Sequence, residues 1–217
     1  MSSAIPGAIP NLVSLRDSLR QDLHDSPADK WADTALERHI LRAVAEYSQA
    51  YPDPQKTTLT AAPNSRDLAI ASLADLVRIE AVEWKVDQYP RQFVAWQAWG
   101  TTLTMLVDSP PQAADSVYVY WGRLQACTTA SCSVPAADLD LVLTGAAGYA
   151  AQEWATFATN RVNVDRAAVE RYAELARRDL EHFHRELARR PRRGRVLANS
   201  LKAPVEAVRQ GDVVRWG

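Results

Sequence analysis

The sequence predicts an α+β protein that is mainly α-helical: a helical bundle with an inserted small antiparallel β-sheet and an extended C-terminal tail. Apolar residues recur at steps of three and four in the first 50 residues and again from residue 138 to 190, which is the period of an amphipathic helix. Between residues 77 and 125, short runs of aromatic and β-branched residues alternate with turn signals, as in antiparallel strands.

The first helices follow from apolar spacing. Residues 1–10 are rich in proline and predict an extended N-terminal arm. One face of a first helix is expected to carry Leu12, Leu15, Leu19 and Leu23. Asp33 is the expected N-cap of a second helix, whose apolar face would hold Leu36, Ile40, Ala43, Val44 and Tyr47. The Tyr51-Pro52 step ends that helix, because a residue before proline is disfavoured in the α conformation. Residues 55–65 are expected to form a loop and residues 65–76 a short helical segment.

The strand-rich segment, residues 77–126, is predicted to be a β insertion between two parts of the bundle, residues 11–76 and 127–190. Strands are expected at 77–84, 93–96, 101–107 and 117–121. The segment holds Trp84, Trp96, Trp99 and Trp121, and these large side chains are expected to form the core of the sheet.

Two long helices are predicted in the second half. The first, 138–158, has Asp138 as a possible cap and is apolar nearly all round, which is typical of a buried helix. Gly145 and Gly148 weaken a helix, and close approach of a neighbouring helix would compensate. The second helix, 164–190, ends before Pro191, and residues 191–217 lack a helical period and are expected to form the tail.

The composition, 47% hydrophobic and 24% charged residues, is that of a soluble globular protein. No apolar run is long enough to cross a bilayer, and the N-terminus does not resemble a signal peptide, so we expect synthesis in the cytoplasm and no membrane contact. Cys127 and Cys132 are expected to be reduced thiols near a loop, with a local disulfide as the alternative; two cysteines with no histidine close in sequence are too few for a structural zinc site.

Charge is unevenly distributed. Residues 1–150 carry 11 basic and 17 acidic residues, a net −6, whereas residues 151–217 carry 14 and 9, a net +5. This split suits two ends that face different partners, or copies that pack head to side in a ring. A basic contact patch is predicted at the end of the last helix, comprising Arg189, Arg190, Arg192, Arg193 and Arg195. It could be a solvated helix end, a contact to an acidic protein surface, or a contact to a phosphate backbone.

The sequence predicts no catalytic, cofactor-binding or metal-binding residues, and therefore not an enzyme. His182 and His184 lie two residues apart on a helix and point in different directions, so they cannot share a metal ion. Asp138-Leu139-Asp140 has a spacing used by some metal-dependent transferases, but it opens a helix, where carboxylates are favoured in any case. Signature motifs of nucleotide-binding proteins, serine hydrolases and zinc proteases are absent from the sequence.

Several segments together resemble the head–tail connector (adaptor) proteins of tailed bacteriophages. These are the short Leu-periodic helix, Trp31-Ala32-Asp33 opening the next helix, Ala43 to Ser48 within it, Val134 to Asp138, and the Ala-rich stretch 145–151. A closing amphipathic helix and a loose tail follow. The resemblance covers about residues 11–51 and 135–190, and the strand-rich segment departs from the purely helical version of the family.

The resemblance implies a structural virion protein in the neck between capsid and tail: a ring of copies, twelve in the familiar cases, that binds the portal protein and a downstream tail or neck protein. DNA would pass through its central channel without sequence-specific binding. In that family the C-terminal segment docks onto the portal, which here corresponds to residues 195–217, with the contact residues Arg195, Val196, Leu197, Leu201, Val205, Val208, Val213, Val214 and Trp216. The alternatives are another phage interaction protein (tail completion or capsid accessory) and a DNA-binding regulator that uses the basic patch.

Overall fold

The computed structural model describes residues 10–159 and 165–189, which form two compact units. The helical unit comprises residues 10–51 and 125–189, and the β unit comprises residues 52–124. The expected extended arm (1–10), except for Pro10, and the tail (191–217) lie outside the described residues.

The prediction of a helical bundle with one small inserted sheet is wrong. The described chain has four helices and seven strands in two antiparallel sheets, with 44% of residues helical and 24% in strands, so it is α+β but not a helical bundle. Strands already begin at Asp53, where a loop and then a short helix were expected for residues 55–76. The β unit has a hydrophobic core of its own, separate from that of the helical unit.

Helices α1 (Leu12–Asp22) and α2 (Asp33–Ala50) bury the apolar faces that their spacing predicts. Asn11 caps α1: its side chain accepts a hydrogen bond from Ser14 N, and Ser14 Oγ accepts one from Asn11 N. The expected N-cap of α2 is wrong by one residue, since Ala32 occupies that position and Asp33 begins the helix. Asp33 instead forms ion pairs with Arg16 and Arg20 of α1.

The turn between α1 and α2 is built around Asp25, whose carboxylate is 2% exposed. Its two oxygens accept hydrogen bonds from Arg20 Nη1 and from the backbone N–H groups of Asp29, Lys30 and Trp31. A buried carboxylate is stable only when its lone pairs are satisfied in this way. The turn places Trp31 in the core, where its Nε1 donates to the carbonyl of Ala150.

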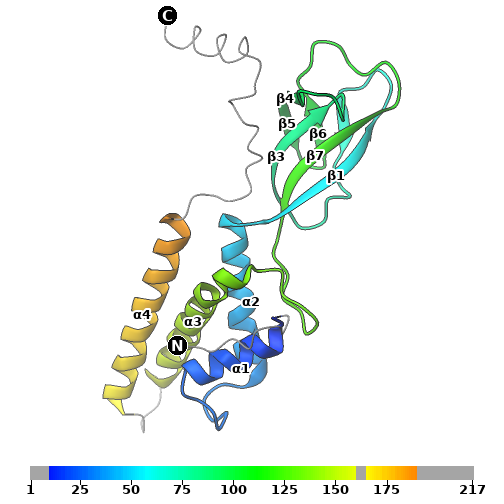
Figure 1. The fold of residues 1–217 in the computed structure, drawn as a ribbon. Coiled ribbons are helices and arrows are strands. Elements are labelled where there is room, and N and C mark those ends of the chain that lie inside the picture. The colour runs from blue at the N-terminus through cyan, green and yellow to red at the C-terminus, as the bar shows by residue number, and fades with distance from the viewer. Residues whose placement is uncertain (1–9, 160–164, 190–217) are drawn as a thin grey trace, which may run out of the picture. The chain divides into compact units, whose positions relative to one another are not determined.

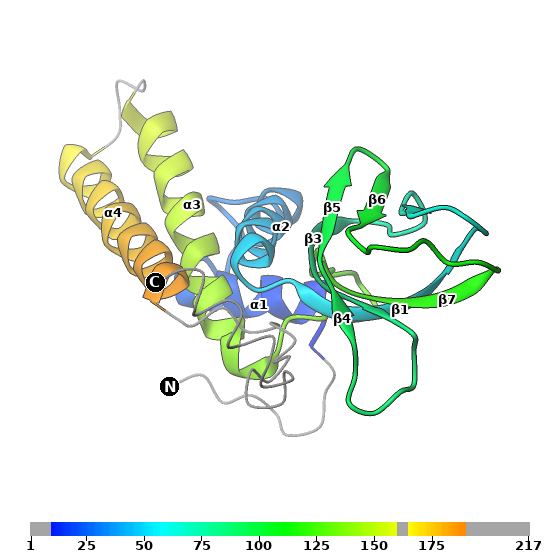
Figure 2. The same ribbon diagram turned by 90° about the horizontal axis from the view of Figure 1, so that it is seen from above.

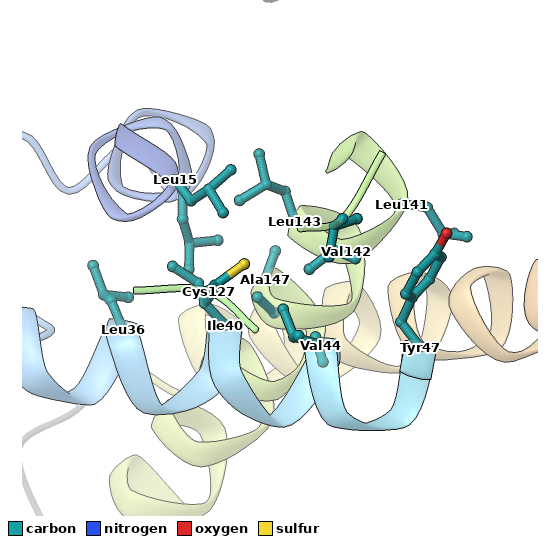
Figure 3. Packing of buried hydrophobic residues seen from close by; sticks show 14 of the residues in the cluster. Leu15, Leu36, Ile40, Val44, Tyr47, Cys127, Leu141, Val142, Leu143 and Ala147 are labelled. Atoms are coloured by element: carbon teal, nitrogen blue, oxygen red, sulfur yellow. The ribbon is translucent and has the colours of Figure 1, made fainter. Parts of the chain in front are cut away.

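A 3₁₀ turn, η1 (Ala136–Asp138), leads into α3 (Leu139–Thr159), and α4 (Arg166–Arg189) follows. Helix α3 lies between α2 and α4 (Figures 1 and 2). As its all-round apolar character predicts, 12 of its 21 residues are buried. Figure 3 shows the packing of α1, α2 and α3 around the hydrophobic core of the helical unit. The residues labelled there are Leu15, Leu36, Ile40, Val44, Tyr47, Cys127, Leu141, Val142, Leu143 and Ala147.

The two glycines of α3 allow α4 to approach closely, as predicted. A Cβ atom at Gly145 would lie 2.9 Å from Cγ of Phe183, and one at Gly148 would lie 2.8 Å from Cγ of Leu180. Carbon atoms normally pack at about 3.5–4.0 Å, so only glycine fits at either position without a shift of the neighbour.

Cys127 and Cys132 form a disulfide in the segment that leads to α3, which corrects the expectation of two reduced thiols. The two residues face each other across an antiparallel bridge, with their Cα atoms 4.0 Å apart. The turn between the two cysteines brings them together, and their spacing in the sequence alone did not reveal this turn. Both side chains belong to the hydrophobic core of the helical unit.

The β unit contains two antiparallel sheets. The four-stranded sheet has the order β1-β7-β3-β4, and the three-stranded sheet has the order β2-β6-β5. The strands are β1 (Asp53–Ala61), β2 (Asp67–Ala69), β3 (Leu76–Trp84), β4 (Phe93–Val94), β5 (Trp96–Trp99), β6 (Thr102–Met105) and β7 (Asp115–Arg123). Strands β4 and β5 are separated only by Ala95, so nearly continuous chain passes from one sheet to the other.

The tryptophans only partly form the core that was expected. Trp121 is buried in it, and Trp84 and Trp96 are half-buried against it. Trp99 is 87% exposed at the end of the β5–β6 hairpin, so its assignment to the core is wrong. Leu68, Ile70 and Leu73, from the segment expected to be helical, are buried in this core.

Candidate functional site: the outer face of helix α4

Helix α4 is the longest helix described, with 24 residues, yet only Ala176 and Phe183 are fully buried. Its inner side packs on α3 at the two glycines. Near its start, Tyr172 packs against Trp154, with ring centroids 4.3 Å apart, and its hydroxyl accepts a hydrogen bond of 2.6 Å from Lys30 Nζ. These contacts fix one side of α4 and leave the other side to solvent.

A polar cluster from three helices fastens the C-terminal half of α4. Tyr149 of α3 donates a hydrogen bond of 2.6 Å to Glu46 of α2, and His184 Nε2 of α4 lies 3.1 Å from the other oxygen of Glu46. The guanidinium of Arg42 lies 3.8 Å from the centre of the Tyr149 ring. Burial, reinforced by the hydrogen bond to Glu46, raises the pKa of Tyr149 far above its usual value. The phenol is therefore a permanent donor, and the cluster acts as a clamp between helices.

The outer face of α4 is densely charged in both signs. Residues 165–189 contain six arginines and six acidic residues, so this segment is neutral. Arg177 bridges Glu174 and Glu181 at 2.6 and 3.0 Å. The hydrogen bond from Arg177 lowers the pKa of Glu174 although this carboxylate is exposed. These pairs keep the helix ordered while its outer face stays in water.

A shallow, open depression of about 590 Å³ lies on this face. It is lined by Ala167, Glu170, Arg171, Glu174, Leu175 and Arg178. Pockets that bind small molecules enclose most of the ligand and exclude water from it. An open depression of mixed charge does not do so. It can accept protruding side chains of another protein, whose charges would pair with the arginines and glutamates. We therefore regard the outer face of α4 as a candidate protein–protein contact.

Most of the predicted site residues lie in the C-terminal segment beyond α4. The nine residues of the predicted portal-docking tail and all of the basic patch except Arg189 lie outside the described part of the chain. Arg189 is exposed at the end of α4 and forms a weak ion pair with Glu186 at 3.8 Å. The positive excess of the C-terminal third also lies outside, because α4 itself is neutral.

His39, His184 and the paired carboxylates occupy structural positions. His39 is buried in α2 and bonded to Glu153 of α3, which Arg38 also contacts. Burial lowers the pKa of His39 despite the carboxylate beside it. The carboxylate of Asp138 is buried and accepts a 2.7 Å hydrogen bond from Tyr47, whereas Asp140 is exposed, so the two do not form one site. The clamp of Glu46, Tyr149 and His184 was missed because its members lie far apart in sequence.

Neither relatives nor special sites point to a particular chemistry. No protein-family model matches the sequence, and no curated protein matches it significantly. In the residues that the structure describes, no group of three or more histidine, cysteine or acidic side chains could hold a metal ion. None of the described helices is long and apolar enough to cross a membrane.

Proposed function

We propose that this chain is a structural subunit of the neck of a tailed bacteriophage, a head–tail connector that assembles as a ring between portal and tail around a DNA channel. The observation that carries the proposal is α4: a long helix, clamped on one side, whose outer face of paired charges is free to contact another copy. The helices α1 to α4 occur in the order of the connector family that the sequence resembles, with the β unit inserted between α2 and α3.

The structure narrows which surfaces such a ring could use. Helix α3 is mostly buried within its own unit, so it is a poor candidate for a contact between copies. The outer face of α4 is accessible, and we assign the lateral contact to it. A ring needs a contact in which two different surfaces of neighbouring copies meet, and mixed charges suit such a heterologous contact. The residues from 195 onward would dock onto the portal, and a downstream tail or neck protein would bind the opposite side of the ring.

The test is assembly. Full-length protein, alone and mixed with the portal protein encoded in the same genome, is examined by mass photometry and negative-stain electron microscopy. We expect closed rings, twelve-membered in the family that the chain resembles, which join the portal. A chain that remains monomeric in both conditions would refute the proposal.

Two variants locate the contacts. Arg171 and Arg178 are 73% and 69% exposed, so the double change to glutamate leaves the fold intact but reverses charge at the depression, and rings are expected to be lost. Lys85→Glu, an exposed reversal in the β unit, serves as the matched control and should assemble normally. A chain that ends at residue 189 should form rings but fail to join the portal.

A further inference from the structure

Strand β5 forms an edge of the three-stranded sheet, and within the described residues it pairs with β6 alone. The chain from residue 92 to residue 107, which includes β5 and β6, contains no charged side chain. Gln97, Ala98 and Trp99 of β5 are all exposed. An exposed, uncharged edge strand is a template for pairing with another strand.

The edge strand of the other sheet is protected against such pairing. Strand β1 carries Pro54, which cannot donate a backbone hydrogen bond, and the exposed lysine Lys56. Both are devices by which proteins keep an edge strand unpaired. The β unit therefore protects the β1 edge against pairing with another strand but leaves the β5 edge without such protection. This difference indicates that β5 has a partner.

The hairpin fixes which backbone groups of β5 are available. Gly100 and Thr101 form a two-residue loop, in which Gly100 has a φ of +57°, so Trp99 and Thr102 are a hydrogen-bonded pair. Pairs alternate along an antiparallel ladder, so the N–H and C=O groups of Gln97 and Trp99 point toward β6. Those of Trp96 and Ala98 point away from β6, toward the open edge.

We propose that β5 pairs antiparallel with β5 of a second copy of this chain, across a two-fold axis at Gln97. In this register Trp96 pairs with the partner's Ala98, and Ala98 with the partner's Trp96, through four backbone hydrogen bonds. Gln97 faces the partner's Gln97 as a non-hydrogen-bonded pair. The two three-stranded sheets then become one continuous six-stranded sheet.

The register also covers the exposed apolar side chains on the outer face of this sheet. Trp99, 87% exposed, lies opposite the partner's Ala95, a small residue that leaves room for the indole ring. Leu106 is 55% exposed and lies beside Ala95 in the same copy, because Leu106 N donates to the carbonyl of Ala95. Each Trp99 therefore packs over the partner's Ala95 and Leu106.

A second copy fits this edge better than the other strand edges that the structure describes. An uncharged edge that loses its water needs an uncharged partner, because an unpaired charge is costly to bury. Strand β1 carries Asp53 and Lys56, β2 carries Asp67, and β4 has only two residues. Strand β5 itself is the described edge strand that is uncharged and long enough. The contact is two-fold, so it is separate from the ring contact proposed for α4 and does not depend on it.

Cysteine cross-linking of the full-length protein tests the register. Non-hydrogen-bonded pairs have Cα atoms about 4.5 Å apart, within the range of a disulfide. We therefore expect Gln97→Cys to give a covalent dimer on mild oxidation, seen on a non-reducing denaturing gel. Thr104→Cys is the control: it lies opposite Gln97 on β6, so three strand spacings, about 14 Å, separate it from its counterpart, and no cross-link is expected.

Sedimentation of uncross-linked protein tests the energetics. Trp99→Ser should weaken dimerisation by about tenfold or more, as loss of a central aromatic anchor does. Tyr89→Ser is the matched control, an 88% exposed aromatic outside this edge, and should leave dimerisation unchanged. The proposal is overturned if Gln97→Cys cross-links no better than Thr104→Cys, or if the chain stays monomeric at about 100 µM. An equal effect of the two serine variants would also overturn it. Cross-linking that persists in the Arg171→Glu, Arg178→Glu variant would separate this contact from the ring.

Discussion

Replacement of Gly145 by alanine probes the contact between α3 and α4 with opposing effects of known size. In a free helix alanine is more stable than glycine by about 1 kcal/mol. In this protein the new Cβ would meet three atoms of the Phe183 ring at 2.9–3.0 Å. The ring is fully buried and rigid, so it cannot move aside without disturbing the core. Overpacking of this kind costs about 1–3 kcal/mol, so we expect a net loss of up to about 2 kcal/mol.

The assay is urea unfolding followed by the helical circular dichroism signal, which reports mainly on the helical unit. Phe183→Leu provides the second arm of a double-mutant cycle, because it replaces the planar ring with a smaller side chain that can rotate away. In that background Gly145→Ala should become neutral or stabilising, by up to about 1 kcal/mol. Stabilisation by Gly145→Ala in the parent protein, or the same loss in both backgrounds, would refute the argument of close approach.

Four further predictions concern charge. Asp25→Asn replaces one of the two oxygens that accept four hydrogen bonds by an NH2 donor and leaves Arg20 without its buried carboxylate, so the free energy of unfolding should fall by about 2–4 kcal/mol in urea titrations. The lowered pKa of His39 means that the unfolded state binds more protons, so stability should decrease as pH falls below about 6.5; His39→Gln should flatten that slope, and an unchanged slope would contradict this. The lowered pKa of Glu153 extends the loss of stability below about pH 4.5. Replacement of the five arginines in 189–195 by alanine should abolish any salt-dependent DNA binding, and binding that survives would exclude this patch as its cause.

The sequence predicted those elements whose side chains bury one face in a regular period. The apolar face of α2, the strands β3 and β7, and the helices α3 and α4 were found because 3.6-residue or two-residue periodicity reports burial directly. The close approach at Gly145 and Gly148 was also predictable, since two glycines inside a helix need a compensating contact.

The elements that were not predicted have a weaker periodicity of apolar residues in the sequence. Strand β1 is an edge strand whose exposed positions hold Pro54, Lys56 and threonines, so its alternation resembled a loop. Leu68, Ile70 and Leu73 belong to a short strand and the turns after it, where apolar residues are spaced irregularly. The fold class was wrong for this reason: the missed segments belong to the second sheet and to the edge of the first.

The clamp that holds α4 in place could not have been found from local patterns, because its residues come from helices far apart in sequence. Glu46, Tyr149 and His184 meet only when α2, α3 and α4 pack together. Likewise, an apolar helix such as α3 can be buried inside its own unit or between copies, and its sequence is the same in both cases. Only packing distinguishes the two, and here it removes α3 from the surfaces open to a partner.

The location of charge separates the possible roles of the molecule. The described residues contain 17 basic and 24 acidic side chains, a net −7, so the remaining residues carry the balance of +6. A net charge of this sign on the described residues opposes long-range attraction to the phosphate backbone. A DNA-binding regulator would depend on the basic patch, of which only Arg189 belongs to the described residues. The proposed connector would instead need a channel wall to which passing DNA does not adhere. The negative net charge of the described residues therefore suits the proposed connector better than a regulator that would hold DNA with these residues.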